Sequence, residues 1–372
     1  MTRATGRLIS SGDDGTIYVY GERGHTVVSR LRNTHGCHHL GLCDGGERLV
    51  YVTRDGWLEH RGVSTGTKYP IKGATHPRAN YGERAAEYRY EQVFSNFHDK
   101  KFALLRLYDW KQSTLTQPQG PERIKPSSLN LFRFRNSRRR TNEPIQYGNT
   151  VYLSAEKLVA GCWTENFFAA AYGSTIATHD GHDRYSTNNE SPDAGWFAKH
   201  SVGADVRCMA PGGGDTVWGG TEDGRIFRLN LQTEALAPAE FYRIPETPVI
   251  DCVAASPCGR YLAVGVDYDA YGAILVYSGR EVRPVLMIDC GRVPSHLAWR
   301  YERFQEAPDA DDPDEALTLF SGHGNGNVCK WYVARQLRWQ GLMEERQRPP
   351  GQDRVERVAD LVEENLGRAI DV

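Results

Sequence analysis

A pattern of short hairpins recurs along the chain and constrains the fold more than any other feature. Each copy has an apolar strand, a tight turn rich in glycine and aspartate, and a second, alternating strand. Copies run through residues 8–20, 49–59 and 216–229. An Asp-Gly pair between apolar runs is a strong hairpin signal, because the turn needs a positive φ that glycine adopts without steric penalty. The pattern therefore predicts a series of antiparallel strand pairs.

Two further copies carry longer turns and make the pattern specific. The stretch Ser256-Pro257-Cys258-Gly259-Arg260-Tyr261-Leu262-Ala263 leads into a strand at residues 272–277, and residues 317–322 lead into 328–332. This order of strand, glycine-rich hairpin and strand ending in an aromatic residue resembles the middle of a WD repeat. Gly15 and Gly56 lie 41 residues apart, which fits the family period of about 40–45. The resemblance spans about residues 7–342, although no copy ends in the Trp-Asp dipeptide.

The resemblance implies an all-β fold, a single β-propeller of about seven four-stranded blades. In the middle third we expect strands at residues 91–94, 101–105, 128–135, 158–163, 167–172, 174–178 and 196–200. The first blade has little chain for an inner strand, so its completion would use a strand from elsewhere. A two-domain enzyme with helices between parallel strands is disfavoured, because almost no long helical period precedes residue 350.

The end of the chain shows the one clear helical period. We expect the propeller to cover residues 1–342, a linker to cover 343–351, and an amphipathic helix outside the ring to cover 352–372. The apolar stripe of that helix would pack on the propeller or lie in the groove of a partner. Its residues are Val355, Val358, Leu361, Val362, Leu366 and Ile370.

Composition limits the environment and the partners. The 372 residues are 40% hydrophobic, which is enough for a substantial core, and their formal net charge of −2 gives no global attraction to nucleic acid or membrane. No apolar run approaches the roughly 20 residues that span a bilayer, and the first residues lack the apolar region of a secretory signal. The eight cysteines are scattered, so we expect reduced, buried thiols and an intracellular protein, cytoplasmic or nuclear.

Two clusters could carry metal or catalytic chemistry. Cys37, His38, His39 and Cys43 include zinc-ligand types, but no second ligand module is evident, and alternating side chains of a strand cannot all converge on one ion. Residues 179–183, His-Asp-Gly-His-Asp, precede a polar loop and lack a nucleophile elbow, a phosphate loop or a dinucleotide fingerprint. We expect no catalytic residue, no metal and no cofactor.

One basic patch is interleaved with Phe132 and Phe134. Its guanidinium groups could contact phosphates of a nucleic acid or an acidic protein, or form a solvated loop. The patch consists of Arg133, Arg135, Arg138, Arg139 and Arg140.

The hairpin turns are the expected binding surface. The resemblance implies a shared rim of turns that receives peptides or partner domains, and an acidic rim with tyrosines suits a basic peptide. The candidate rim residues are Asp13, Asp14, Arg54, Glu222, Asp267, Tyr268, Asp269, Tyr271, His323 and Asn325.

These features favour a non-catalytic adaptor that binds other proteins within a multi-protein complex and does not bind membranes. Two alternatives stay open. One is a propeller that binds nucleic acid through the patch at residues 133–140. The other is a propeller enzyme with a site in the central channel.

Overall fold

The structure is a computed structural model, and its contacts divide the chain into two compact units. Unit 1 covers Met1–Gly203 and unit 2 covers Ala204–Val372, and each is described by itself. The structure describes residues 9–11, 14–21, 27–32, 36–54, 56–69, 88–95, 101–108, 128–134, 144–146, 151–152, 158–179, 198–232, 240–244, 246, 248–257, 259–269, 271–278, 284–301, 317–333, 337 and 370–371.

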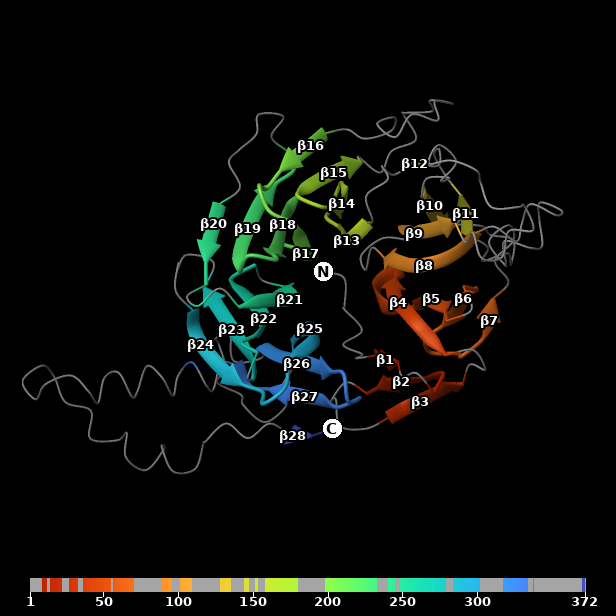
Figure 1. The fold of residues 1–372 in the computed structure, drawn as a ribbon. Helices are drawn as coiled ribbons and strands as arrows, with labels where there is room; N and C mark the ends of the chain where they lie inside the picture. The colour runs from red at the N-terminus through yellow and green to blue at the C-terminus, as the bar shows by residue number, and fades with distance from the viewer. Residues whose placement is uncertain are drawn as a thin grey trace, which may run out of the picture. The chain divides into compact units, whose positions relative to one another are not determined.

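The described part of unit 1 contains four antiparallel sheets, whose strands are labelled in Figure 1. The first has the order β1-β2-β3, the second β4-β5-β6-β7, the third β11-β10-β9-β8 with β12 also pairing with β10, and the fourth β13-β14-β15-β16. The bounds are β1 Ile9–Ser11, β2 Thr16–Tyr20, β3 Val27–Arg32, β4 Cys37–Cys43, the 3₁₀ turn η1 Asp44–Gly46, β5 Arg48–Thr53, β6 Leu58–Gly62, β7 Lys68–Tyr69, β8 Tyr88–Ser95, β9 Lys101–Tyr108, β10 Ser128–Phe134, β11 Pro144–Gln146, β12 Val151–Tyr152, β13 Leu158–Trp163, β14 Phe168–Tyr172, β15 Thr175–His179 and β16 Ala198–Ser201.

The described part of unit 2 contains three antiparallel sheets of four strands. Their orders are β17-β18-β19-β20, β21-β22-β23-β24 and β25-β26-β27-β28. The bounds are β17 Val206–Pro211, β18 Thr216–Thr221, β19 Arg225–Asn230, β20 Glu240–Arg243, β21 Val249–Ala255, β22 Tyr261–Asp267, β23 Gly272–Ser278, β24 Pro284–Asp289, β25 Pro294–Tyr301, β26 Leu317–His323, β27 Val328–Trp331 and β28 Ile370–Asp371.

The expected strand pattern is confirmed. The described residues form seven sheets in chain order, and the strands expected in the middle third are present as β8, β9, β10 and β13 to β16. The first sheet has three described strands. Gly15 lies between β1 and β2 as Gly56 lies between β5 and β6, so β1 corresponds to a second strand. The sheet thus has no inner strand among the described residues, and how the first blade is completed stays a prediction.

The helix expected at residues 352–372 is wrong at Ile370. This residue belongs to β28, where it pairs with Lys330 while Asp371 pairs with Cys329. The exposed edge of β27 offers backbone donors and acceptors, and a strand satisfies them where a helix could not. The other stripe residues, 355–366, and the linker at 343–351 lie outside the described residues, and the domain bounds stay a prediction.

Close contacts at glycine join neighbouring sheets of unit 2. A Cβ on Gly220 of β18 would lie 2.3 Å from Ile250 Cγ2, and one on Gly265 of β22 would lie 2.7 Å from Pro294 Cγ. In both cases the second strand of one sheet meets the first strand of the next. Only a residue without a side chain allows that approach, so these glycines set the spacing of the sheets.

Two tryptophans connect sheets through their indole N–H groups. Trp163 of β13 donates to the Phe94 carbonyl of β8 at 2.9 Å in unit 1. Trp299 of β25 donates in the same way to the Ala254 carbonyl of β21 at 2.9 Å in unit 2. Each bond satisfies a carbonyl near the end of an inner strand, so both units use one device to hold adjacent sheets together.

The cysteines fit the expectation of buried thiols. Among the described residues seven cysteines are free of disulfides, and all but the half-buried Cys290 are buried. Burial raises the pKa of Cys162 and of Cys208 to about 12, so both thiols are protonated at neutral pH. Within the described part of the chain no helix is long and apolar enough to cross a membrane.

Candidate interaction surface

The hairpin turns of unit 2 lie beside the loops that lead into its inner strands. The Glu222 amide, in the β18–β19 turn, donates to the Asp205 carbonyl, just before β17, at 2.8 Å. In the next sheet, the Cys290 amide donates to the Gly272 carbonyl at 3.0 Å. We call the described residues of these turns and loops the turn surface of unit 2. They are residues 204–205, 222–224, 244, 246, 248, 267–269, 271, 290–293 and 324–327.

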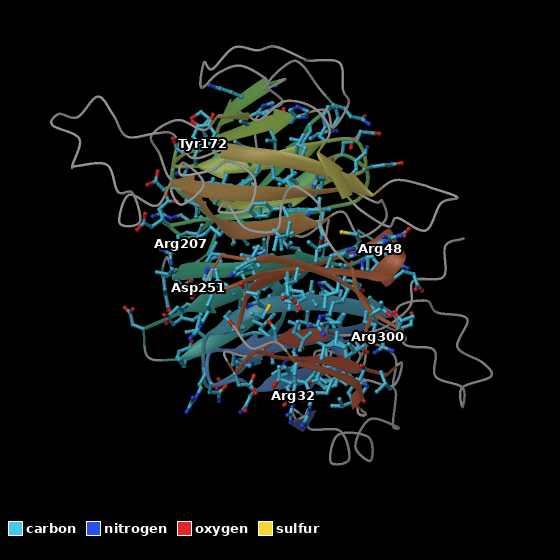
Figure 2. The ribbon with its side chains drawn as sticks, turned by 90° about the vertical axis from the view of Figure 1, so that its right-hand side faces the viewer. Arg32, Arg48, Tyr172, Arg207, Asp251 and Arg300 are labelled. Carbon is cyan, nitrogen blue, oxygen red and sulfur yellow. The ribbon has the colours of Figure 1, made fainter. Side chains whose placement is uncertain are left out.

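Adjacent inner strands keep neighbouring turns at the same end of unit 2. Arg207 of β17 and Asp251 of β21 form an ion pair of 3.3 Å near the starts of these two strands. Both side chains are labelled in Figure 2, where they lie next to each other. The pair is partly exposed, so it contributes little to stability.

The β18–β19 turn shows how the sequence builds such a hairpin. Gly224 has a φ of 74°, which is the positive φ that the Asp-Gly pair predicts for the turn. The Thr221 hydroxyl accepts the Arg225 amide at 3.1 Å and donates to Asp223 at 2.6 Å. The bond from the Arg225 guanidinium is the main cause that lowers the pKa of Asp223. Asp223 therefore supports the turn, whereas the neighbouring Glu222 is exposed to solvent.

The β22–β23 turn presents two stacked tyrosines. The rings of Tyr268 and Tyr271 lie 5.1 Å apart with an interplanar angle of 20°, and the Tyr268 amide donates to the Tyr271 carbonyl at 3.1 Å. Tyr268 packs against the core of the unit, while Tyr271 is 37% exposed. Burial, followed by the charges of Tyr271 and Glu246, raises the pKa of Tyr268. The partly buried ring of Tyr268 thus holds the exposed ring of Tyr271 in place.

Carboxylates lie in the same turn as this tyrosine pair and in the stretch before β21. Asp269 accepts no bond from a described side chain, and its amide donates to Asp267 Oδ1 at 2.9 Å. Glu246 reaches the pair from the loop before β21. On the turn surface and the residues bordering it, carboxylates outnumber guanidinium groups. The carboxylates belong to Asp205, Glu222, Asp223, Glu246, Asp267, Asp269 and Asp289, and the guanidinium groups to Arg225, Arg243 and Arg292.

The turn of the last sheet is built differently. His323 is 8% exposed, and its Nε2 lies 2.9 Å from the Ser321 hydroxyl, which accepts the Trp331 indole N–H at 2.9 Å. Burial lowers the pKa of His323, so the ring is neutral at pH 7. Asn325 is exposed and accepts the Asn327 amide at 3.1 Å. A binding role for His323 would have to act through this buried network.

The predicted rim residues of unit 1 lie on two turns. Asp14 accepts both the Thr16 amide and the Thr16 hydroxyl at 2.9 Å, and the amide bond is the first cause that lowers the pKa of Asp14. Arg54 is exposed on the β5–β6 turn, and Asp13 lies outside the described residues. Trp57, on the same turn, is 38% exposed and was not predicted.

The other candidate clusters are only partly described. Cys37 and Cys43 are buried while His38 is exposed, and burial raises the pKa of Cys37 to about 11. No group of three or more possible metal-binding side chains occurs among the described residues. His179 is buried at the end of β15, and residues 180–183 lie outside the described part.

The basic patch contributes one described position. Arg133 lies on β10, paired with Lys101 of β9 and Ile145 of β11. Arg135, Arg138, Arg139 and Arg140 lie outside the described residues, so binding of nucleic acid by this patch stays a prediction.

Comparison with known proteins identifies the class of fold. No protein-family model matches the chain, and no curated protein matches it. The structure is similar to the crystal structure of the Cps50 (Swd1) β-propeller domain of Myceliophteria thermophila, with a TM-score of 0.59 and 13% sequence identity, over 90% of this chain and 95% of that chain. The fold is thus a β-propeller, as the resemblance to WD repeats implied, and its sheets are the blades.

Proposed function

We propose that this protein is a non-catalytic scaffold whose turn surface of unit 2 binds a basic segment of a partner protein. The observation that carries the proposal is the stacked pair of Tyr268 and Tyr271, one ring partly buried and the other exposed, together with the charge of Glu246 that acts on Tyr268. An aromatic face beside carboxylates attracts guanidinium and ammonium groups through the ring quadrupole and through charge.

The arrangement favours a cationic side chain over an apolar one. Tyr271 offers its exposed face at little further entropic cost, because the stacking on Tyr268 already orders the ring. A cation over an exposed ring contributes about 0.5–1 kcal/mol, and exposed ion pairs contribute about the same each. Several such contacts together give an affinity suited to a reversible scaffold.

Fluorescence anisotropy with a labelled peptide of alternating arginine and glycine tests the proposal. We expect Tyr271→Ala to weaken binding by about threefold to tenfold, because the cation–π contact and the ring surface are lost. Glu246→Gln removes one charge without changing shape and should weaken binding by about twofold to fivefold at low salt.

Glu165→Gln is the matched control, because it removes one exposed carboxylate from the β13–β14 turn in unit 1. Glu165→Gln should leave the affinity within twofold. A peptide of alternating glutamate and glycine should not bind the wild type. If Glu165→Gln weakens binding as much as Glu246→Gln while Tyr271→Ala leaves it unchanged, the peptide responds to overall charge alone and the proposed surface is wrong. If the arginine peptide does not bind at all, the proposal also fails.

A further inference from the structure

Strand β3 of unit 1 is an outer strand with an unusual pair of exposed valines. Among the large hydrophobic side chains that the structure describes, Val28 at 56% and Val27 at 48% are the most exposed. The register shifts at this point, since Val19 pairs with Ser29 and Tyr20 with Val27. The resulting bulge places two successive apolar side chains in solvent, which a regular alternating strand would not do.

Other outer strands carry residues that discourage pairing with another chain. Proline opens β24 at Pro284 and β11 at Pro144, and lysine occupies β7 at Lys68 and β16 at Lys199. Natural edges use these residue types to avoid unwanted strands. The first three residues of β3, Val-Val-Ser, contain neither, and no described strand pairs with the outer edge of β3.

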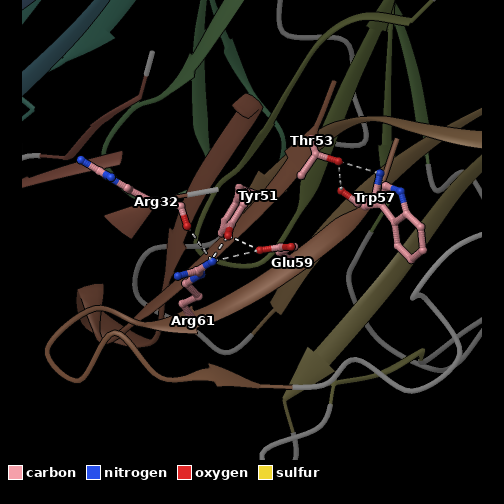
Figure 3. Close-up of polar contacts among 6 residues, drawn as sticks. All are labelled: Arg32, Tyr51, Thr53, Trp57, Glu59 and Arg61. Atoms are coloured by element: carbon pink, nitrogen blue, oxygen red, sulfur yellow. Dashed lines mark hydrogen bonds and ion pairs between the residues drawn. The ribbon is translucent and has the colours of Figure 1, made fainter. Parts of the chain in front are cut away.

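A partly buried network contacts the end of β3. The Arg32 carbonyl accepts an N–H of the Arg61 guanidinium at 3.2 Å. Arg61 also donates to the Tyr51 hydroxyl at 2.9 Å and pairs with Glu59 at 3.4 Å, and Tyr51 donates to Glu59 (Figure 3). Tyr51 and Glu59 are buried. The strand is therefore held in an extended form before any partner arrives, which lowers the entropic cost of binding.

The charges of β3 indicate what would pair with it. Arg30 and Arg32 are exposed, and Arg30 lies over the Tyr18 ring at 5.0 Å. Among the described residues neither guanidinium forms an ion pair. Antiparallel pairing of two copies of β3 in the register that sets Arg30 opposite Arg30 would place like charges across the strand pair, which is destabilising. Charge thus disfavours a second copy and favours an acidic strand.

We propose that β3 receives an extended segment of another protein as an added antiparallel strand, with branched apolar residues against Val27 and Val28 and carboxylates against Arg30 and Arg32. The backbone of such a segment bonds the open edge, and its alternate side chains give specificity. Read from its amino end, the segment has acidic residues first and apolar residues after them, because the strands are antiparallel. This surface lies in unit 1 and shares no residue with the turn surface of unit 2.

Selection of displayed random linear peptides on the full chain tests the proposal. The enriched peptides should share acidic residues followed by valine or isoleucine. One enriched peptide is then titrated against two variants that keep strand propensity, Val28→Thr and Arg30→Glu. Each cross-strand pair contributes about 0.2–1 kcal/mol, so each variant should weaken binding by about twofold to fivefold. Equal thermal unfolding of the variants and the wild type shows that the fold is intact.

Methylation of the peptide backbone distinguishes strand pairing from side-chain docking. N-methyl groups on alternate amides, those that face β3, should abolish binding, whereas methylation of the intervening amides should not. Four results would overturn the proposal. They are binding that tolerates every N-methyl group, enriched peptides without the acidic-apolar order, a concentration-dependent dimer lost in Val28→Thr, and hydrogen-exchange protection of the outward β3 amides in the free chain. The last two would assign the edge to a second copy or to a segment of this chain.

Discussion

Replacing Gly272 with alanine tests whether the β22–β23 turn depends on a close main-chain contact. A Cβ there would lie 2.2 Å from both Arg292 C and Val293 N, and 2.3 Å from Arg292 O. The loop would have to retreat by roughly 1 Å to restore an ordinary contact. Overpacking of this kind costs about 1–3 kcal/mol, and the retreat would strain the Cys290–Gly272 bond of 3.0 Å, which contributes about 1 kcal/mol.

Alanine also restricts the unfolded chain, which offsets about 0.4–1 kcal/mol. We therefore expect Gly272→Ala to lower the free energy of unfolding by about 2–3 kcal/mol, measured by urea denaturation followed by tryptophan fluorescence. Gly324→Ala is the control, because a Cβ at this exposed turn position meets no atom within 4 Å. A loss below about 0.5 kcal/mol for Gly272→Ala, or an equal loss for both variants, would refute the close-contact reasoning.

Three further changes probe buried groups. Burial, and secondarily a nearby arginine, lowers the pKa of His60 to about 3. Between pH 6.5 and that value only the unfolded chain binds this proton. The free energy of unfolding should therefore fall by about 1.4 kcal/mol for each pH unit by which the pH is lowered. His60→Gln should flatten that slope in urea titrations at several pH values, and an unchanged slope would contradict the assignment. Trp331→Phe leaves a buried serine hydroxyl without its indole donor and should cost about 1–3 kcal/mol, while the exposed Trp57→Phe should stay within about 0.5 kcal/mol. Arg61→Met leaves Glu59 buried beside Tyr51 without its cation and should cost about 3–5 kcal/mol, part of which the added Glu59→Gln should restore in a double-mutant cycle.

The strand pattern was predictable because each hairpin is encoded locally. Gly15, Gly56 and Gly224 all have positive φ in tight turns, and such turns can be read from two adjacent residues. The end of the chain was not predictable in the same way. Ile370 follows a helical period in the sequence, yet it pairs with Lys330, and a pairing between distant segments leaves no local signal.

The interaction surface was partly visible in the sequence. Tyr268 and Tyr271 were predicted from their place in a hairpin turn, but their stacking depends on the core beneath Tyr268. Glu246 was not predicted, because only the packing of the loop before β21 brings it to the tyrosines. Trp57 could have been found, since it alternates with the buried Leu58 directly after an Asp-Gly turn. Alternation alone indicates that such a residue faces solvent.

The two proposed surfaces select ligands of opposite charge on a chain whose formal net charge is only −2. The turn surface of unit 2 combines carboxylates with an exposed tyrosine, and β3 combines arginines with exposed valines. A segment that suits one surface is repelled by the other, so the arginine peptide and the acidic-apolar peptide should bind independently. Tyr271→Ala should weaken only the first peptide, and Arg30→Glu only the second. Local separation of charge, which net charge conceals, would thus let one scaffold hold two different partners.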